Sequence, residues 1–240
     1  MMARVDGRKD DELRKIEAKA GIIKRADGSG YFKIGNTEAY AAVYGPRNLY
    51  PRFMQNPERG ILRCSYNMMP FSGAGERVRP GGSRRSKEIS LVTEKALLPV
   101  LELSEYPNSV VDIFIEFPQT DAGTRCAGIC AASIALADAG LEMKDLVSAV
   151  AVGFVNGRIM VDVSKEEEDM EGMTDIPVAV LPGTGKISLL QMDGQIPAPE
   201  LKRAVAMAKE ACKKLYEIQK NALKEKYHSF EIGEENQKIF

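Results

Sequence analysis

The sequence has no tryptophan and only one histidine, His228, among its 240 residues. A single histidine argues against Ser-His or Cys-His nucleophilic catalysis, because such a nucleophile needs an adjacent base. Any chemistry in this chain must therefore come from carboxylates, arginines and lysines.

Cysteine is scarce as well, with four residues and no Cys-x-x-Cys pair. Cys126 and Cys130 stand four residues apart on a predicted helix, and with one histidine they make a poor zinc set. We interpret them as small buried residues. Four unpatterned cysteines fit a reducing compartment, so we expect the protein in the cytoplasm.

Long apolar runs and a strong net charge are also absent. No stretch of 18 apolar residues occurs, and the first 15 residues are charged throughout, so we expect neither a signal peptide nor a membrane partner. The net charge of −1 excludes a generally basic nucleic-acid-binding surface. A polyanion would have to bind a local patch.

The apolar residues that are present, 44% of the chain, suffice for a sizeable core. Their spacing predicts an α+β fold with mixed sheets and packed helices, in two similar halves sharing one core, about 10–105 and 106–228. We see no linker and expect one domain over 1–240, with a polar tail at 229–240. The expected strands cover 13–20, 31–34, 37–44, 61–69, 110–117, 149–155, 158–163, 176–181 and 186–192, and the expected helices cover 86–103, 124–141 and 199–227.

An acidic stretch between two predicted strands is the first candidate site. Most of its carboxylates, from Glu166 to Glu171, are typical of a solvated loop. Asp175 differs, because it lies where the loop enters a strand and faces away from the apolar side of that strand. Asp169 precedes it by six residues. Two carboxylates at such a position can hold a divalent cation or act as acid and base.

Two predicted helix starts are candidate anion sites. Gly123, Thr124 and Arg125 follow a strand, so free backbone N–H groups, a hydroxyl and a guanidinium meet there. Thr124 as a helix cap is an equal alternative. Arg84 and Arg85 begin the other helix, where positive charges oppose the helix dipole. Their position therefore indicates an external anion rather than helix stabilisation. A role in surface solubility is an equal alternative.

Several motifs in order resemble the RNase PH family. They are RVDGR at 4–8, LRCSYNMMPFS at 62–72, SRRSKEIS at 83–90, DAGTRCAGICAASIALADAG at 121–140 and EEEDMEGMTDIPVAV at 166–180. RVDGR, PFS and EEEDM make the chain similar, more narrowly, to the catalytic RNase PH-type subunits of the archaeal exosome. Cys126 departs from bacterial relatives, which carry a hydroxyl residue there. The resemblance implies a duplicated α+β fold whose halves are like domain 2 of ribosomal protein S5.

The resemblance also implies roles for individual residues. It assigns phosphate binding to Arg85, Gly123, Thr124 and Arg125, and catalysis to Asp169 and Asp175, which are also the implied Mg²⁺ ligands. It assigns RNA contacts to Arg84, Arg63 and Tyr66.

The implied activity is 3′→5′ phosphorolysis of RNA, with inorganic phosphate as co-substrate, nucleoside diphosphates as products and RNA tailing as the reverse reaction. The implied partners are single-stranded RNA 3′ ends, an inactive RNase PH-like subunit in a hexameric ring of three heterodimers, and RNA-binding cap subunits. Three alternatives stay open: a bacterial-type RNase PH that trims tRNA 3′ ends, a hydrolytic exonuclease with paired metals, and a non-catalytic RNA-binding ring subunit.

Overall fold

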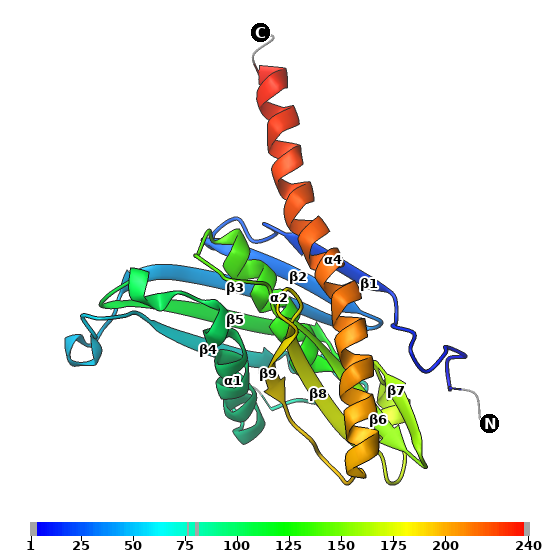
Figure 1. Ribbon diagram of the computed structural model, residues 1–240. Helices are drawn as coiled ribbons and strands as arrows, with labels where there is room; N and C mark the ends of the chain where they lie inside the picture. The colour runs from blue at the N-terminus through cyan, green and yellow to red at the C-terminus, as the bar shows by residue number, and fades with distance from the viewer. Residues whose placement is uncertain (1–3, 76, 80–81, 238–240) are drawn as a thin grey trace.

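The computed structural model describes residues 4–75, 77–79 and 82–237, and the fold is α+β as predicted. Each of the nine predicted strands is present in this part of the chain, in two sheets (Figure 1). The strands are β1 Ile16–Ala20, β2 Gly28–Ile34, β3 Thr37–Asn48, β4 Ile61–Met68, β5 Ser109–Gln119, β6 Ser148–Val155, β7 Arg158–Val161, β8 Thr174–Leu181 and β9 Lys186–Leu190.

The first sheet has the order β1-β2-β3-β5-β4. Its neighbours pair antiparallel except β4 and β5, which run parallel and are joined by a helical crossover. β5 belongs to this sheet, although it comes after the predicted boundary between the two halves at residues 105 and 106. The pairing of a strand is set by the burial of its apolar side chains. In β5, Ile113 and Ile115 are buried in the core and lie opposite residues of β3.

The second sheet has the order β7-β6-β8-β9, with every pair antiparallel. Its β6–β7 hairpin turns at Asn156 and Gly157, whose φ angles of 50° and 77° are both positive. This is the backbone that a two-residue hairpin needs, and it confirms the turn predicted from Asn-Gly.

Helix α2, Thr124–Asp138, packs against both sheets and forms the centre of the core. Nearly all its side chains are buried, which explains why it is apolar on every side. It also approaches β2 closely: a Cβ on Gly28 would lie 2.2 Å from the Ala139 backbone nitrogen, and one on Gly30 would lie 2.3 Å from the Ala131 carbonyl oxygen. Glycine on the strand and alanine on the helix permit this spacing.

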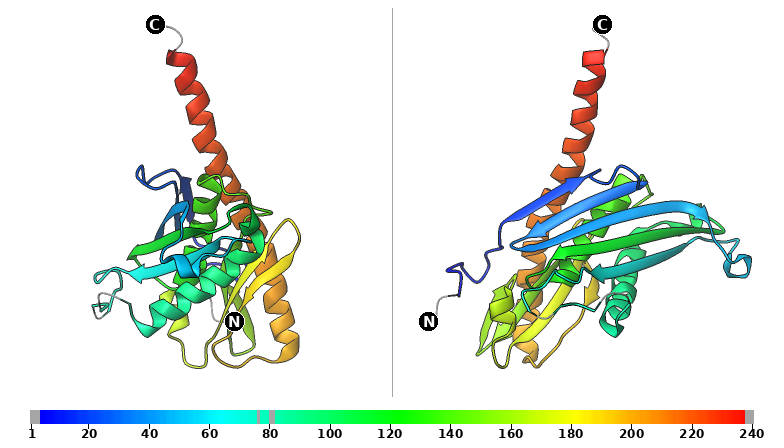
Figure 2. Two further views of the ribbon diagram at one scale, coloured as in Figure 1. Left: turned by 90° about the vertical axis from the view of Figure 1, so that its left-hand side faces the viewer. Right: turned by 180° about the vertical axis from the view of Figure 1, so that it is seen from behind.

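The other helices lie outside these layers. α1, Arg84–Leu97, packs on β4, and short 3₁₀ turns at 98–100 and 103–105 replace the end of the helix predicted to reach 103. α4, Ala198–Gln237, packs on β6 and β1, and its C-terminal part projects beyond the sheets (Figure 2). The predicted tail is therefore helical through Gln237, and 238–240 lie outside the described residues. No helix in the described ranges is long and apolar enough to cross a bilayer.

Candidate active site

A cleft of about 830 Å³ opens where both predicted helix starts meet the acidic stretch. The strand β8, the N-termini of α1 and α2, and the short helix α3, Lys165–Glu168, all contribute to its wall. Among its lining residues are Tyr66, Arg79, Arg85, Ser86, Asp121, Gly123, Thr124, Arg125, Cys126, Lys165, Glu166, Glu168 and Asp175.

The N-terminus of α2 forms the anion-binding wall of this cleft. Ala122 and Gly123 both have positive φ, 55° and 63°, and they turn the chain from β5 into the helix. Gly123 is the N-cap and supplies no side-chain cap, so the alternative that Thr124 caps the helix is wrong. The first N–H groups of a helix have no intrahelical acceptor and attract anions.

Two arginines bring positive charge to the same wall. Arg125 is the second residue of α2, and its Nη2 lies 3.5 Å from Glu88 Oε2 on α1. Its Nε is buried without a hydrogen-bond partner, so one donor remains for a ligand. Arg85 also lines the cleft, from the first turn of α1, whose N-cap Ser83 accepts a hydrogen bond from Ser86. The structure thus brings together the four residues predicted to bind phosphate.

Asp175 faces the same cleft from the start of β8. Burial, followed by the charge of Glu168, raises the pKa of its carboxyl to about 6, although Arg125 and Arg85 act in the opposite direction. Its Oδ1 is buried without a hydrogen-bond partner. A carboxyl group with this pKa is partly protonated near neutrality and can act as a proton donor.

Asp169 does not line this cleft. It is exposed at the C-terminus of α3 and pairs with Lys165 Nζ at 2.6 Å. The cleft lining therefore includes Asp175 but not Asp169, and Glu168 is the α3 side chain whose charge raises the pKa of Asp175.

The acidic stretch is also not a uniformly solvated loop. Ser164 caps α3, and Glu167 closes a capping box while its side chain is fully buried against Arg4. The Ser-x-x-Glu spacing of a capping box was present in the sequence and would have predicted this short helix.

The three predicted RNA contacts have different surroundings. Tyr66 is buried, and its hydroxyl donates to Thr124 Oγ1 at 2.8 Å, so it supports the anion-binding wall and does not offer its ring to a base. Arg63 forms a two-bond contact with Asp112 outside the cleft. Arg84 is exposed beside the cleft without lining it.

The described residues hold no group of three or more His, Cys, Asp or Glu side chains arranged for a metal ion. Magnesium commonly takes only one or two carboxylates, together with waters and substrate phosphate oxygens. The unpartnered Asp175 oxygen fits such a partial site, whereas Asp169 pairs with Lys165 and lies outside the cleft lining.

Sequence reasoning missed Ser86, Asp121 and Glu168, which all line the cleft. Asp121 connects the two sides of the site, because its Oδ1 accepts a hydrogen bond from the Lys165 backbone nitrogen at 3.0 Å. No local pattern signals this contact between residues 44 positions apart.

Comparison with known protein families identifies two consecutive matches. The first domain of the RNase PH-type 3′ exoribonuclease family matches residues 12–142, and the second domain matches residues 145–211.

Individual relatives agree with these matches. The chain is 54% identical over 224 residues to "Exosome complex component Rrp41" of Methanopyrus kandleri, which covers 93% of both chains. It is 52% identical to the protein of the same name from Thermococcus kodakarensis, over 93% of this chain and 89% of the other.

Two solved structures share the fold at low sequence identity. Rice Rrp46 superposes with a TM-score of 0.80 and 22% identity, covering 92% of this chain and all of the other. A chain of the Archaeoglobus fulgidus exosome "with RNA bound to the active site" superposes with a TM-score of 0.76 and 23% identity. The match covers 90% of this chain and 92% of the other.

Proposed function

The chain belongs to the RNase PH-type 3′ exoribonuclease family, and on this premise we propose that it degrades RNA from the 3′ end by phosphorolysis, as the active subunit of an archaeal exosome. The substrate is a single-stranded 3′ end, the co-substrate is inorganic phosphate, and the product is a nucleoside diphosphate. Run in reverse, the site adds nucleotides from diphosphates.

One observation carries this proposal. Arg125 Nε and Asp175 Oδ1 are buried without hydrogen-bond partners, and both residues line the same cleft as the N-terminus of α2. A hydrolytic exonuclease with paired metals gives no reason for such an anion site, and among the described residues no three carboxylates of the cleft are arranged to hold a metal ion.

In the proposed reaction, an oxygen of inorganic phosphate attacks the phosphorus of the last phosphodiester. The bond from that phosphorus to the 3′ oxygen of the shortened RNA breaks, and this oxygen takes a proton from Asp175. Arg85, Arg125 and the backbone of the Gly123–Thr124 turn hold the attacking phosphate. Their charge offsets the strong repulsion between two phosphates in contact.

Magnesium and Asp169 remain part of the proposal. As the alternative to donating a proton, Asp175 in its ionised form would hold the ion together with substrate phosphate oxygens, and Asp169 would join only if its side chain left Lys165. The ion would supply charge neutralisation at the leaving oxygen.

We also propose that RNA is held by the basic stretch around the cleft, which includes Arg84, and that an inactive RNase PH-like subunit and RNA-binding cap subunits complete the particle. The names of the Methanopyrus and Thermococcus relatives support an exosome assembly. The exposed apolar side chains of Tyr50, Phe53 and Met54 support a surface that is covered by a partner. Four free cysteines fit our expectation of a reducing cytoplasm.

The test uses RNA labelled in its 3′-terminal nucleotide, with and without inorganic phosphate. We expect labelled nucleoside diphosphates that form only when phosphate is present. Monophosphates formed without phosphate would indicate hydrolysis, and no product from the chain, alone or assembled with a partner subunit, would indicate a non-catalytic ring subunit.

A further inference from the structure

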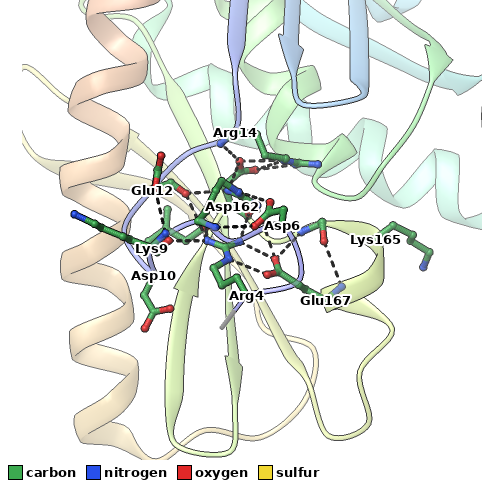
Figure 3. Close-up of polar contacts among 12 residues, drawn as sticks. Arg4, Asp6, Lys9, Asp10, Glu12, Arg14, Asp162, Lys165 and Glu167 are labelled. Atoms are coloured by element: carbon green, nitrogen blue, oxygen red, sulfur yellow. Dashed lines mark hydrogen bonds and ion pairs between the residues drawn. The ribbon is translucent and has the colours of Figure 1, made fainter. Parts of the chain in front are cut away.

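The N-terminal segment, residues 4–14, is attached to the active site by buried arginines (Figure 3). Arg4 donates from Nε and Nη2 to the two carboxylate oxygens of Glu167 at 2.8 and 2.7 Å, and both side chains are fully buried. Because Glu167 belongs to α3, this pair fixes the segment to the helix that carries Glu168.

Arg14 lies deeper and contacts two parts of the site. Its Nη2 donates to Asp162 Oδ1 at 2.7 Å and its Nε to Oδ2 at 3.0 Å, while its backbone nitrogen donates to Oδ2 at 2.7 Å. Its remaining Nη1 donates to the carbonyl oxygen of Asp121 at 2.6 Å. Asp162 has a φ of 56°, an unfavourable backbone for a residue with a side chain, and the two-bond contact with Arg14 offsets that cost.

The contact with Asp121 leads directly to the anion-binding turn. Asp121 precedes Ala122 and Gly123, the two residues of positive φ whose backbone starts α2. A Cβ on Gly123 would lie 3.5 Å from Arg14 Nη2, so the guanidinium packs against the turn itself. The Asp121 carboxylate in turn holds the first residue of α3. One arginine therefore joins the anion-binding turn, α3 and the end of β7.

We infer that Arg14 is a positioning residue for phosphate, which fixes the Ala122–Gly123 turn through the Asp121 carbonyl and is itself oriented by Asp162. It lines no part of the cleft and touches no reacting atom. This inference rests on the proposed function, because it assigns the turn to inorganic phosphate. Small displacements of a binding group lose much of its contribution, so the effect should appear in phosphate affinity.

The main test is Arg14→Lys, measured in the ring assembled with its partner, or in the chain alone if it turns over RNA. Lysine keeps the positive charge but cannot form the planar fork that reaches Asp162 and Asp121 together. We expect the KM for phosphate to rise roughly 10- to 100-fold, the loss typical when a residue that orients a binding group is removed. We expect kcat to change far less and RNA affinity, measured by fluorescence anisotropy, to stay unchanged.

Arg158→Lys is the matched control. Arg158 also ties the N-terminal segment to β7, through Asp10 Oδ1 at 2.5 Å, whereas the contact with the Asp121 carbonyl oxygen is made by Arg14. We expect its phosphate KM to equal that of the unchanged protein. A rise of the same size in both variants would show that any loosening of the segment suffices, and would overturn the specific role of Arg14.

Asp162→Asn and the double variant test the route of the effect. If Asp162 acts by orienting Arg14, the double variant has the phosphate KM of the more impaired single variant, whereas effects that multiply would contradict this route. Stabilisation of each variant by inorganic phosphate in thermal unfolding gives the affinity without turnover. A lower melting temperature of Arg14→Lys with an unchanged phosphate KM would reduce Arg14 to a structural residue. Hydrolysis without phosphate by the unchanged protein would instead remove the proposed function itself.

Discussion

At the scale of single residues, the site depends on two groups that the fold leaves without partners. Burial and the nearby charge of Glu168 keep the pKa of Asp175 at about 6, and a neighbouring guanidinium retains a free buried donor. A buried polar atom without a partner costs free energy, so such atoms in a cleft commonly mark the place of a ligand. The predictions at this scale therefore concern protons and phosphate.

Asp175→Asn keeps the shape of the side chain and removes its proton. We expect kcat to fall roughly 10²–10⁴-fold, the usual contribution of a general acid. In the unchanged protein, kcat should fall as pH rises through the pKa of Asp175. This pKa is about 6 without ligands, and the negative charge of bound phosphate and RNA raises it further. This decrease of kcat with rising pH should be absent in Asp175→Asn. Near-normal turnover by Asp175→Asn would contradict the assignment.

The same variant should be more stable than the unchanged protein at neutral pH. The folded state raises the pKa of Asp175 from 3.8 to about 6, so above pH 6 the protein buries a charge that asparagine lacks. We expect a gain on the order of 2 kcal/mol in the free energy of unfolding at pH 7.5. The gain should shrink as pH falls from about 6 to 3.8, where aspartate becomes neutral. Urea denaturation at both ends of this range measures it.

Arg85→Ala and Arg125→Ala should raise the phosphate requirement. Each loses a charge-assisted contact of about 1.5–3 kcal/mol, so the KM for phosphate should increase roughly 10- to 100-fold. Lysine at either position should restore little, since it cannot form a two-bond contact. Titration of phosphate at saturating RNA is the measurement. Unchanged phosphate dependence with lost RNA binding would make these arginines RNA contacts.

At the scale of elements, the active site is assembled from segments that are distant in sequence. α3 has only four residues and cannot be stable alone, so its capping box and the buried contact of Glu167 with Arg4 hold it in place. The strand β8 and the N-terminus of α2 are rigid by comparison, because both belong to the core.

Glu167→Gln tests how strongly α3 is held. It leaves the charge of Arg4 buried without its partner, which should cost about 3–5 kcal/mol of unfolding free energy at pH 7. The pKa of Glu167 is lowered, because hydrogen bonds from Arg4 and Ser164 outweigh burial, so the contribution is complete above pH 4.5 and disappears as pH falls through the lowered pKa. The difference between variant and unchanged protein should therefore close in acid.

Glu210→Gln is the control for this experiment. Its partner Lys213 lies 2.7 Å away, but both side chains are largely exposed. Exposed pairs contribute little, so we expect no measurable change in stability. A loss of similar size in both variants would mean that burial of the Arg4 contact is unimportant.

At the scale of the whole molecule, positive charge is too localised to hold a long RNA. The net charge is −1, and four of the arginines near the cleft lie in a single stretch of the chain, Arg77, Arg79, Arg84 and Arg85. A groove that follows a single strand over several nucleotides needs a longer positive wall. A second subunit is the natural source of that wall.

We therefore expect the isolated chain to degrade RNA feebly, and addition of an inactive RNase PH-like partner to restore activity together with a hexameric mass. Light scattering and the phosphorolysis assay, run on each chain alone and on the mixture, measure both quantities. Full processive activity from a monomer would eliminate the ring. A fully active homohexamer would instead indicate a bacterial-type RNase PH.

Local sequence determined most of the elements. Alternation of apolar residues placed nine strands, and Asn156-Gly157 placed a hairpin, because these signals depend on neighbouring residues alone. Gly123, Thr124 and Arg125 were predictable as an anion site for the same reason. A glycine between a strand and a helix leaves the first backbone N–H groups of that helix without intrahelical acceptors, whatever packs around it.

The tertiary structure decided everything that depends on distant partners. The Tyr66 hydroxyl donates to Thr124, Glu167 pairs with Arg4 across 163 positions, and Asp169 pairs with Lys165 outside the cleft that Asp175 lines. The tertiary structure also decided that β5 pairs with β3 and β4 in the first sheet. Whether a polar side chain is solvated, paired or left free depends on which surfaces pack around it, and packing is a property of the whole fold.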